Sequence, residues 1–90
     1  MKAFKDLVHN EHLVWDGGTQ AKLFFDNGYG VSVVRHENSY GGDIGLYELA
    51  VVQGTEDDFY ITYNTDVTSD VEGYLNEAAV TRLMKLVQAL

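Results

Sequence analysis

The sequence predicts a single two-layer α+β domain, in which a C-terminal helix packs on one face of a four-stranded antiparallel sheet with meander order. Three observations predict it. Four strand-like segments follow one another between turn residues, one amphipathic helical pattern ends the sequence, and no long helical pattern separates the strands. The 90 residues match the length of one domain, and the 46% apolar content is ordinary for a globular protein. We therefore expect residues 1–90 to form one domain.

The N-terminal half is expected to fold as a helical turn, a loop and a β-hairpin. Residues 3–8 carry apolar side chains at helical spacing, whereas 10–18 are mostly polar, with a short apolar run at 13–15 that could add a strand. Alternating apolar residues predict strands at 20–26 and 29–36. The Asn-Gly pair between these strands predicts a type I′ turn, which needs two residues with φ > 0.

Two further strands are expected beyond a glycine-rich loop at 37–45. The segment 46–53 is apolar on both faces, which is typical of a central strand or of one covered on both sides. A polar turn at 54–58 then leads into a strand at 59–64, which alternates apolar and polar residues. Each strand is joined to the next by a short turn or loop, so a meander is the simplest order.

The last element is expected to be a helix at 76–89, with Asn76 as its N-cap. In the polar connection at 65–73, Ser69 and Glu72 have the spacing of a capping box, which predicts a helical turn. The apolar side chains of the predicted helix fall on one face, which would pack on the sheet. This stripe consists of Leu75, Ala79, Leu83, Leu86, Val87 and Leu90, widened by Val80 and Met84.

The charge distribution is the main feature that bears on function. The net charge is −8, and the span between Arg35 and Arg82 contains ten carboxylates and neither lysine nor arginine. Such a surface disfavours direct nucleic-acid binding and attracts a basic partner, although acidic charge also simply keeps a small protein soluble. Tyrosine is enriched at binding hot spots, and Tyr40 in the glycine-rich loop is the best exposed candidate, followed by Tyr60 and Tyr74. The expected partner-binding residues are Glu56, Asp57, Asp58, Asp66, Asp70, Glu72 and Tyr40.

No catalytic, metal or cofactor motif stands out, so we expect a non-enzymatic protein without a cofactor. There is no cysteine and no Gly-x-Ser-x-Gly segment. The three-residue spacing of His9 and His12 would suit zinc on a helix, with Glu11 and His36 as further candidates, but no third ligand is evident and we predict no metal site. The acidic turns lack the spacing of a calcium loop, and the glycine pairs lack the helix that follows a phosphate loop.

Two compositional features bear on location. The absence of cysteine favours a reducing compartment, and the apolar runs are far shorter than the ~20 residues of a membrane span. We therefore expect a cytoplasmic protein.

A resemblance to known proteins is carried by residues 24–34, Ser39-Tyr40-Gly41-Gly42, 45–51, Asp70-Val71 and Gly73-Tyr74-Leu75 with the final helix. Together these stretches resemble a family of small tailed-bacteriophage proteins. The resemblance implies a phage-infected bacterial cytoplasm and no particular activity. Small acidic phage proteins resemble inhibitors of host nucleic-acid enzymes and defence nucleases, which present carboxylates to a basic groove.

Three functional hypotheses follow. The first is a phage-type binding protein that acts on a host protein through its acidic surface. The second is a self-associating structural or accessory protein, a homodimer formed through a sheet edge or through the apolar helix end at 86–90. The third is a small metal-binding protein or enzyme.

Overall fold

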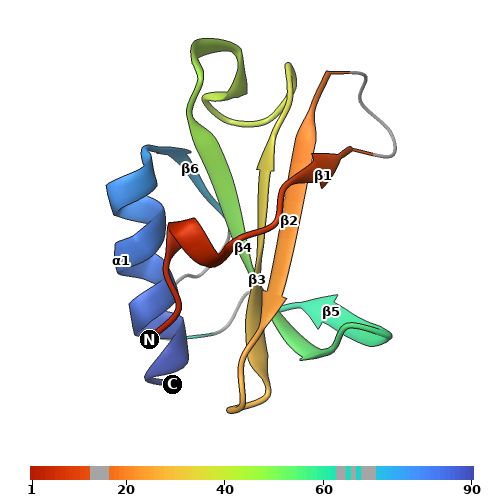
Figure 1. The fold of residues 1–90 in the computed structure, drawn as a ribbon, viewed down its shortest axis with the longest axis vertical. Helices are drawn as coiled ribbons and strands as arrows, with labels where there is room; N and C mark the ends of the chain where they lie inside the picture. Colours follow the sequence, from red (N-terminus) through yellow and green to blue (C-terminus); the bar gives the residue numbers. More distant parts are fainter. Residues whose placement is uncertain (13–16, 63–64, 66, 68–70) are drawn as a thin grey trace.

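The computed structural model describes residues 1–12, 17–62, 65, 67 and 71–90 (Figure 1). It confirms the α+β prediction, with an antiparallel sheet and one C-terminal helix packed against it. The elements are η1 (Phe4–Asp6), β1 (Asn10–Glu11), β2 (Thr19–Phe24), β3 (Tyr29–Arg35), η2 (Gly42–Ile44), β4 (Tyr47–Thr55), β5 (Asp58–Ile61), β6 (Glu72–Leu75) and α1 (Glu77–Gln88).

The sheet has the order β1-β2-β3-β4-β5, and β6 pairs with β4 outside this path. The first half of β4 pairs with β6 (Tyr47 opposite Leu75), and its second half pairs with β5 (Val52 opposite Ile61). Both strands therefore lie along the same side of β4, one after the other. The four predicted strands are present with shifted ends, whereas β1 and β6 were not predicted.

Three local predictions are wrong. Glu72 begins a strand and not the predicted helical turn, and Ser69 lies outside the described residues. Residues 10–11 form a strand and not a loop, whereas the segment 13–15 lies outside the described residues. The β2–β3 turn is not type I′, because Gly28 has a positive φ of 85° and Asn27 does not.

The side chain of Asn27 instead links the hairpin to the C-terminal end of α1 by hydrogen bonds. Its side-chain nitrogen donates to the carbonyl oxygens of Val87 (2.9 Å) and Leu90 (3.3 Å), and its side-chain oxygen accepts from the amide of Tyr29 (3.1 Å). Carbonyl groups at a helix C-terminus lack partners within the helix, so the side chain satisfies groups that water would otherwise bind.

The main core lies between the sheet and α1. Asn76 caps the helix as predicted, since its side chain accepts a hydrogen bond from the Ala79 amide (2.8 Å). Leu75, predicted in the helical stripe, instead lies buried in β6. Burial of apolar surface at this interface is the dominant stabilising term for such a domain. The buried core residues include Val31, Val33, Leu49 and Val51 of the sheet and Val80, Leu83, Met84 and Val87 of the helix.

β4 is buried on both faces, as its apolar sequence predicted. Val52 faces away from α1, yet it is fully buried. On this face the rings of Phe24 and Phe59 lie 5.3 Å apart, and β-strand pairing places Gly30 between their strands. A Cβ atom at Gly30 would lie 2.9 Å from the Phe24 ring, so glycine leaves the room that this aromatic packing needs.

Candidate binding surfaces

The structure separates the predicted acidic residues that it describes into two groups. Glu56, Asp57 and Asp58 are exposed in the β4–β5 turn, whereas Glu72 is exposed in β6. Thr55, next to the turn, and Leu49, the partner of Glu72, are six residues apart on β4, which corresponds to about 20 Å at ~3.3 Å per residue. This separation exceeds the Debye length of ~8 Å at physiological salt.

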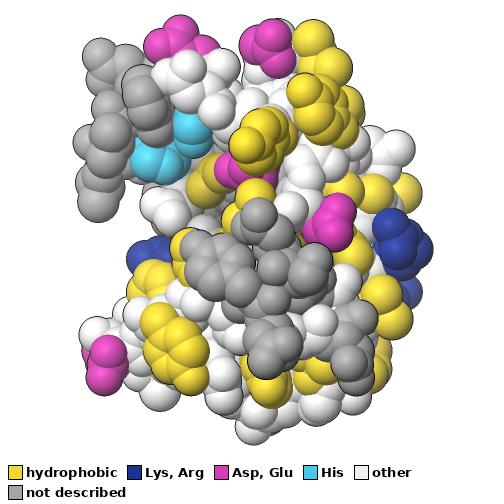
Figure 2. All heavy atoms as spheres, turned by 180° about the vertical axis from the view of Figure 1, so that it is seen from behind, with side chains coloured by type: hydrophobic (Ala, Val, Ile, Leu, Met, Phe, Trp, Pro, Cys, Tyr) yellow, Lys and Arg dark blue, Asp and Glu magenta, His cyan; other side chains and the backbone are white. Residues whose placement is uncertain are grey.

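Figure 2 shows the same division from the face opposite Figure 1. Acidic side chains gather in the upper part of the view, and one further acidic patch lies apart from them at the lower left, on the side of the molecule where Figure 1 places β5. The predicted residues Asp66 and Asp70 lie outside the described residues. The described carboxylates therefore do not form a single cluster.

A second kind of surface lies at the end of the sheet where β3 leads into η2. The side chains of Tyr40, Ile44 and Tyr74 are 59%, 66% and 64% exposed, and we call these three residues the tyrosine surface. Tyr40 and Ile44 come from the glycine-rich loop, whereas Tyr74 comes from β6. The sequence had marked Tyr40 and Tyr74 as exposed candidates, and their exposure is confirmed.

The two tyrosines are fixed by reciprocal contacts with glycines. A Cβ atom at Gly73 would overlap the Cβ of Tyr40, and a Cβ atom at Gly41 would lie 3.1 Å from the Tyr74 ring. The amide of Tyr74 donates to the carbonyl of Tyr40 (3.0 Å). Each tyrosine thus lies against the glycine that neighbours the other, and the two backbones approach more closely than larger residues would allow.

The glycine-rich loop that carries Tyr40 is itself closed by hydrogen bonds. The buried hydroxyl of Ser39 accepts from the His36 amide and donates to the His36 carbonyl, both at 2.9 Å. The Leu46 amide then donates to the Gly41 carbonyl (2.9 Å), which closes the far side of the loop. These bonds hold the base of the tyrosine surface in one conformation.

Tyr74 has a backbone conformation that is unusual for its residue type. Its φ is +56°, and it is the one non-glycine residue with positive φ among those that the structure describes. The left-handed region costs a non-glycine residue about 1–2 kcal/mol. Such strain is most often found at binding and catalytic sites, so it directs attention to this surface.

Carboxylates lie in the loop that carries part of the tyrosine surface. Glu37 and Asp43 are exposed in the same loop as Tyr40 and Ile44, whereas Glu72 of β6 lines a groove beside α1 together with Arg82. No lysine or arginine occurs in the sequence between Arg35 and Arg82. The arrangement combines apolar rings with negative charge.

The histidines do not pair as their spacing suggested. The His12 ring lies 5.0 Å from the His36 ring, whereas His9 contacts Phe4 (5.2 Å) and Tyr47 (5.8 Å). No cluster of three or more histidine, aspartate or glutamate side chains that could hold a metal occurs within the described ranges.

Two features favour the neutral form of His36. Burial lowers its pKa below the usual value, and the nearby His12 lowers this pKa further. In addition, the Asn38 amide donates to Nδ1 of His36 (3.1 Å), which requires an unprotonated Nδ1. Both features lower the tendency of His36 to add positive charge to this end of the molecule.

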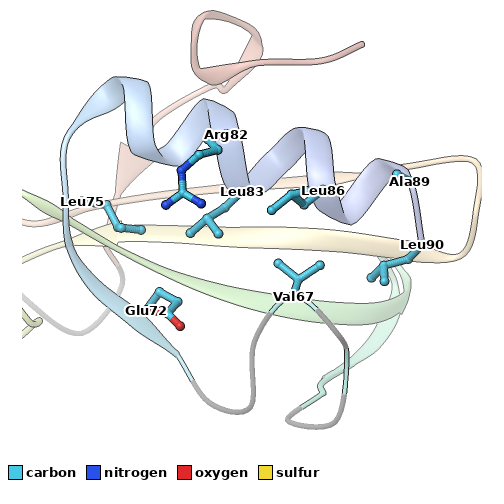
Figure 3. Close-up of a pocket in the computed structure, with 8 residues that line it drawn as sticks. All are labelled: Val67, Glu72, Leu75, Arg82, Leu83, Leu86, Ala89 and Leu90. Atoms are coloured by element: carbon cyan, nitrogen blue, oxygen red, sulfur yellow. The ribbon is translucent and has the colours of Figure 1, made fainter.

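A groove of about 420 Å³ runs along α1 (Figure 3). Arg82 and Glu72 lie toward one end, and Leu86, 47% exposed, and Leu90, 38% exposed, lie toward the other. The sequence had placed both leucines in the apolar stripe of the helix, but neither is fully covered. The other lining residues are Val67, Leu75, Leu83 and Ala89.

No family model, curated protein or solved structure matches the chain. Within the described residues, no helix has the length and apolar character that crossing a bilayer requires. The tyrosine surface and the groove beside α1 are the two features of the described residues that bear on function.

Proposed function

We propose that this chain is a non-enzymatic binding protein that recognises a positively charged surface of another protein through its tyrosine surface and the carboxylates around it. The observation that carries the proposal is the presentation of two tyrosine rings to solvent on a closed, glycine-packed base. Because the base is already ordered, little additional entropy is lost when a partner covers the rings.

The charges favour a basic partner over an acidic or neutral one. Glu37 and Asp43 are exposed in the loop that carries Tyr40, and the sequence contains no lysine or arginine between Arg35 and Arg82. Charges of one sign attract an oppositely charged surface and accelerate its association. Direct nucleic-acid binding would be opposed by the same charges.

The resemblance to tailed-phage proteins supports a host protein as the partner. Enzymes that bind nucleic acids, including defence nucleases, present basic grooves, and a protein that covers such a groove would inhibit the enzyme. In this proposal the tyrosine surface supplies contact area, while the carboxylates supply steering and register.

The proposal is tested by capturing partners from a bacterial host lysate on the immobilised protein and eluting them with a salt gradient. We expect a partner that elutes with rising salt, and that is retained less by a variant carrying Glu37→Gln and Asp43→Asn. The matched control neutralises the distant turn with Glu56→Gln, Asp57→Asn and Asp58→Asn. A partner whose retention is unchanged by salt and by both sets of substitutions would refute the proposal.

Self-association is a second candidate, which the groove beside α1 supports. The partly exposed Leu86 and Leu90 would be covered if a second copy packed against the helix. A dimer measured by light scattering, and converted to monomer by Leu86→Glu, is the expected result. A monomer at all concentrations would exclude this candidate.

A further inference from the structure

From the tyrosine surface we infer that the partner contacts this protein with arginine side chains, which stack on the rings of Tyr40 and Tyr74 while the neighbouring carboxylates accept their hydrogen bonds. The inference rests on the proposed function and specifies the chemistry that the same surface recognises. It concerns a protein segment that carries arginine, not a free cation or a nucleic acid.

The first step is that both tyrosines can make further contacts with a partner. Tyr40 and Tyr74 are each more than half exposed, and neither phenol hydroxyl makes a hydrogen bond within the part of the chain that the structure describes. Tyr60 provides a contrast, since it is 61% exposed but its hydroxyl donates to the side chain of Gln53 (3.0 Å). Exposure alone therefore does not distinguish the tyrosine surface, whereas exposure with unpaired hydroxyl groups does.

The second step is that the segments that carry the two rings are packed together. The Cβ of Tyr40 lies close to Gly73 and Tyr74 lies against Gly41, and the hydrogen bond between the two tyrosine backbones joins them. Separating the two segments would break this packing. Both tyrosines are therefore exposed next to each other before a partner arrives.

The third step concerns the chemistry of the occupant. A cation is attracted by the face of an aromatic ring and by nearby carboxylates, here those of Glu37 and Asp43 in the loop that carries Tyr40. Arginine fits both requirements, because its planar guanidinium group stacks on rings and its N–H donors reach carboxylate oxygens in the same plane. The lysine ammonium group is more strongly hydrated and does not stack, so we expect arginine to be preferred.

The molecule already contains a contact of this type. The guanidinium carbon of Arg35 lies 5.3 Å from the centre of the Tyr47 ring, at the start of β4. There the arginine and the tyrosine belong to the same chain and satisfy each other. At the tyrosine surface only the aromatic and acidic half of such a contact is present within the described residues.

The experiment compares two unstructured probes of equal length and charge, an arginine–glycine repeat peptide and a lysine–glycine repeat peptide. Binding is measured by titration calorimetry and mapped by amide chemical shifts. We expect the arginine peptide to bind about five- to tenfold more tightly, and to shift the amide signals of residues 40–45 and 72–75. The double variant Tyr40→Ser with Tyr74→Asn should lose this preference. Asparagine tolerates positive φ, so the backbone of β6 should be retained.

Tyr60→Ser is the matched control, because it removes an equally exposed tyrosine from β5 and should leave the arginine preference unchanged. Circular dichroism checks that each variant retains its fold. If both peptides bind equally, or if the shifts fall on residues 56–58, the arginine inference fails while the proposed acidic binding function stands. If neither peptide binds to the wild-type protein, both fail.

Discussion

Replacing Gly73 by alanine tests the close approach on which the tyrosine surface depends. The backbone φ of Gly73 is not in the positive region, so alanine meets no conformational penalty there. Its new Cβ would, however, overlap the Cβ of Tyr40, an atom that cannot rotate away because it is bonded directly to the backbone. The Gly41 loop and β6 would have to move apart, and the hydrogen bond from Tyr74 to Tyr40 would lengthen from 3.0 Å.

The expected loss of stability follows from two opposing terms. Overpacking of this kind costs about 1–3 kcal/mol. Replacing glycine by alanine also restricts the unfolded chain, which contributes roughly 0.4–1 kcal/mol of stability in the opposite direction. We therefore expect Gly73→Ala to lower the free energy of unfolding by about 1–2 kcal/mol. For a domain of this size, that corresponds to a melting temperature lower by roughly 5–15 °C.

Urea denaturation followed by far-ultraviolet circular dichroism measures this change. Gly28→Ala is the matched control, because Gly28 has φ +85° with nothing within 4 Å of its Cβ position, so alanine is penalised only through the backbone. Both variants should lose stability, but only Gly73→Ala should weaken binding of the arginine peptide. Unfolding free energies of Gly73→Ala and wild type that agree within about 0.5 kcal/mol would show that Tyr40 and Gly73 are not closely packed.

Three further predictions concern other features of the fold. Because burial and His12 lower the pKa of His36 in the folded state, the folded protein binds fewer protons than the unfolded chain. The contribution of His36 to the free energy of unfolding should thus be largest above about pH 6.5 and fall as the pH decreases through the usual histidine pKa. Urea titrations at several pH values measure this dependence, and the free energy of unfolding should change less steeply with pH in His36→Gln. Asn76→Ala removes the N-cap of α1 and should lower the free energy of unfolding by about 1 kcal/mol, whereas Asn76→Asp should be nearly neutral in the same assay. Tyr74→Gly relieves the positive φ and should raise the melting temperature while weakening binding of the arginine peptide; a lower melting temperature would show that the packing of the ring outweighs its backbone strain.

The strands that follow a strict alternation could be predicted, and those created by tertiary pairing could not. β2, β3, β4 and β5 each show a period of two or an apolar run. In contrast, β6 contains a glycine and only one buried apolar residue, Leu75, and it pairs with β4 through an irregular register. β1 consists of two exposed polar residues. Neither strand has a pattern of its own, so the partner strand determines both.

The β2–β3 turn shows how a local preference is overridden. Asn-Gly favours a two-residue turn in isolated hairpins, but the side chain of Asn27 makes hydrogen bonds to the carbonyl groups of α1. The local sequence of a hairpin carries no information about the helix end that lies beside the hairpin in the folded protein. The prediction therefore failed at a residue whose partners are distant in the sequence.

The candidate site was only partly predictable for the same reason. Tyr40 and Tyr74 could be marked individually, because each lies beside a glycine in the sequence. Their contact depends on the pairing of β6 with β4, which the sequence did not indicate. Conversely, the carboxylates of the β4–β5 turn at 56–58 were expected to act together with Glu72, but the length of β4 separates them.

The backbone strain and the exposed aromatic area of Tyr74 argue that the role of the tyrosine surface is not purely structural. Tyr74 leaves most of its ring in solvent and holds a backbone angle that glycine would adopt without strain. Stability alone would favour a smaller residue, because exposed aromatic area contributes little to folding. Contact with a partner would bury the exposed aromatic area, and the binding free energy would offset the backbone strain of Tyr74. The strained and exposed tyrosine is therefore better explained by what it binds than by what it packs against within its own chain.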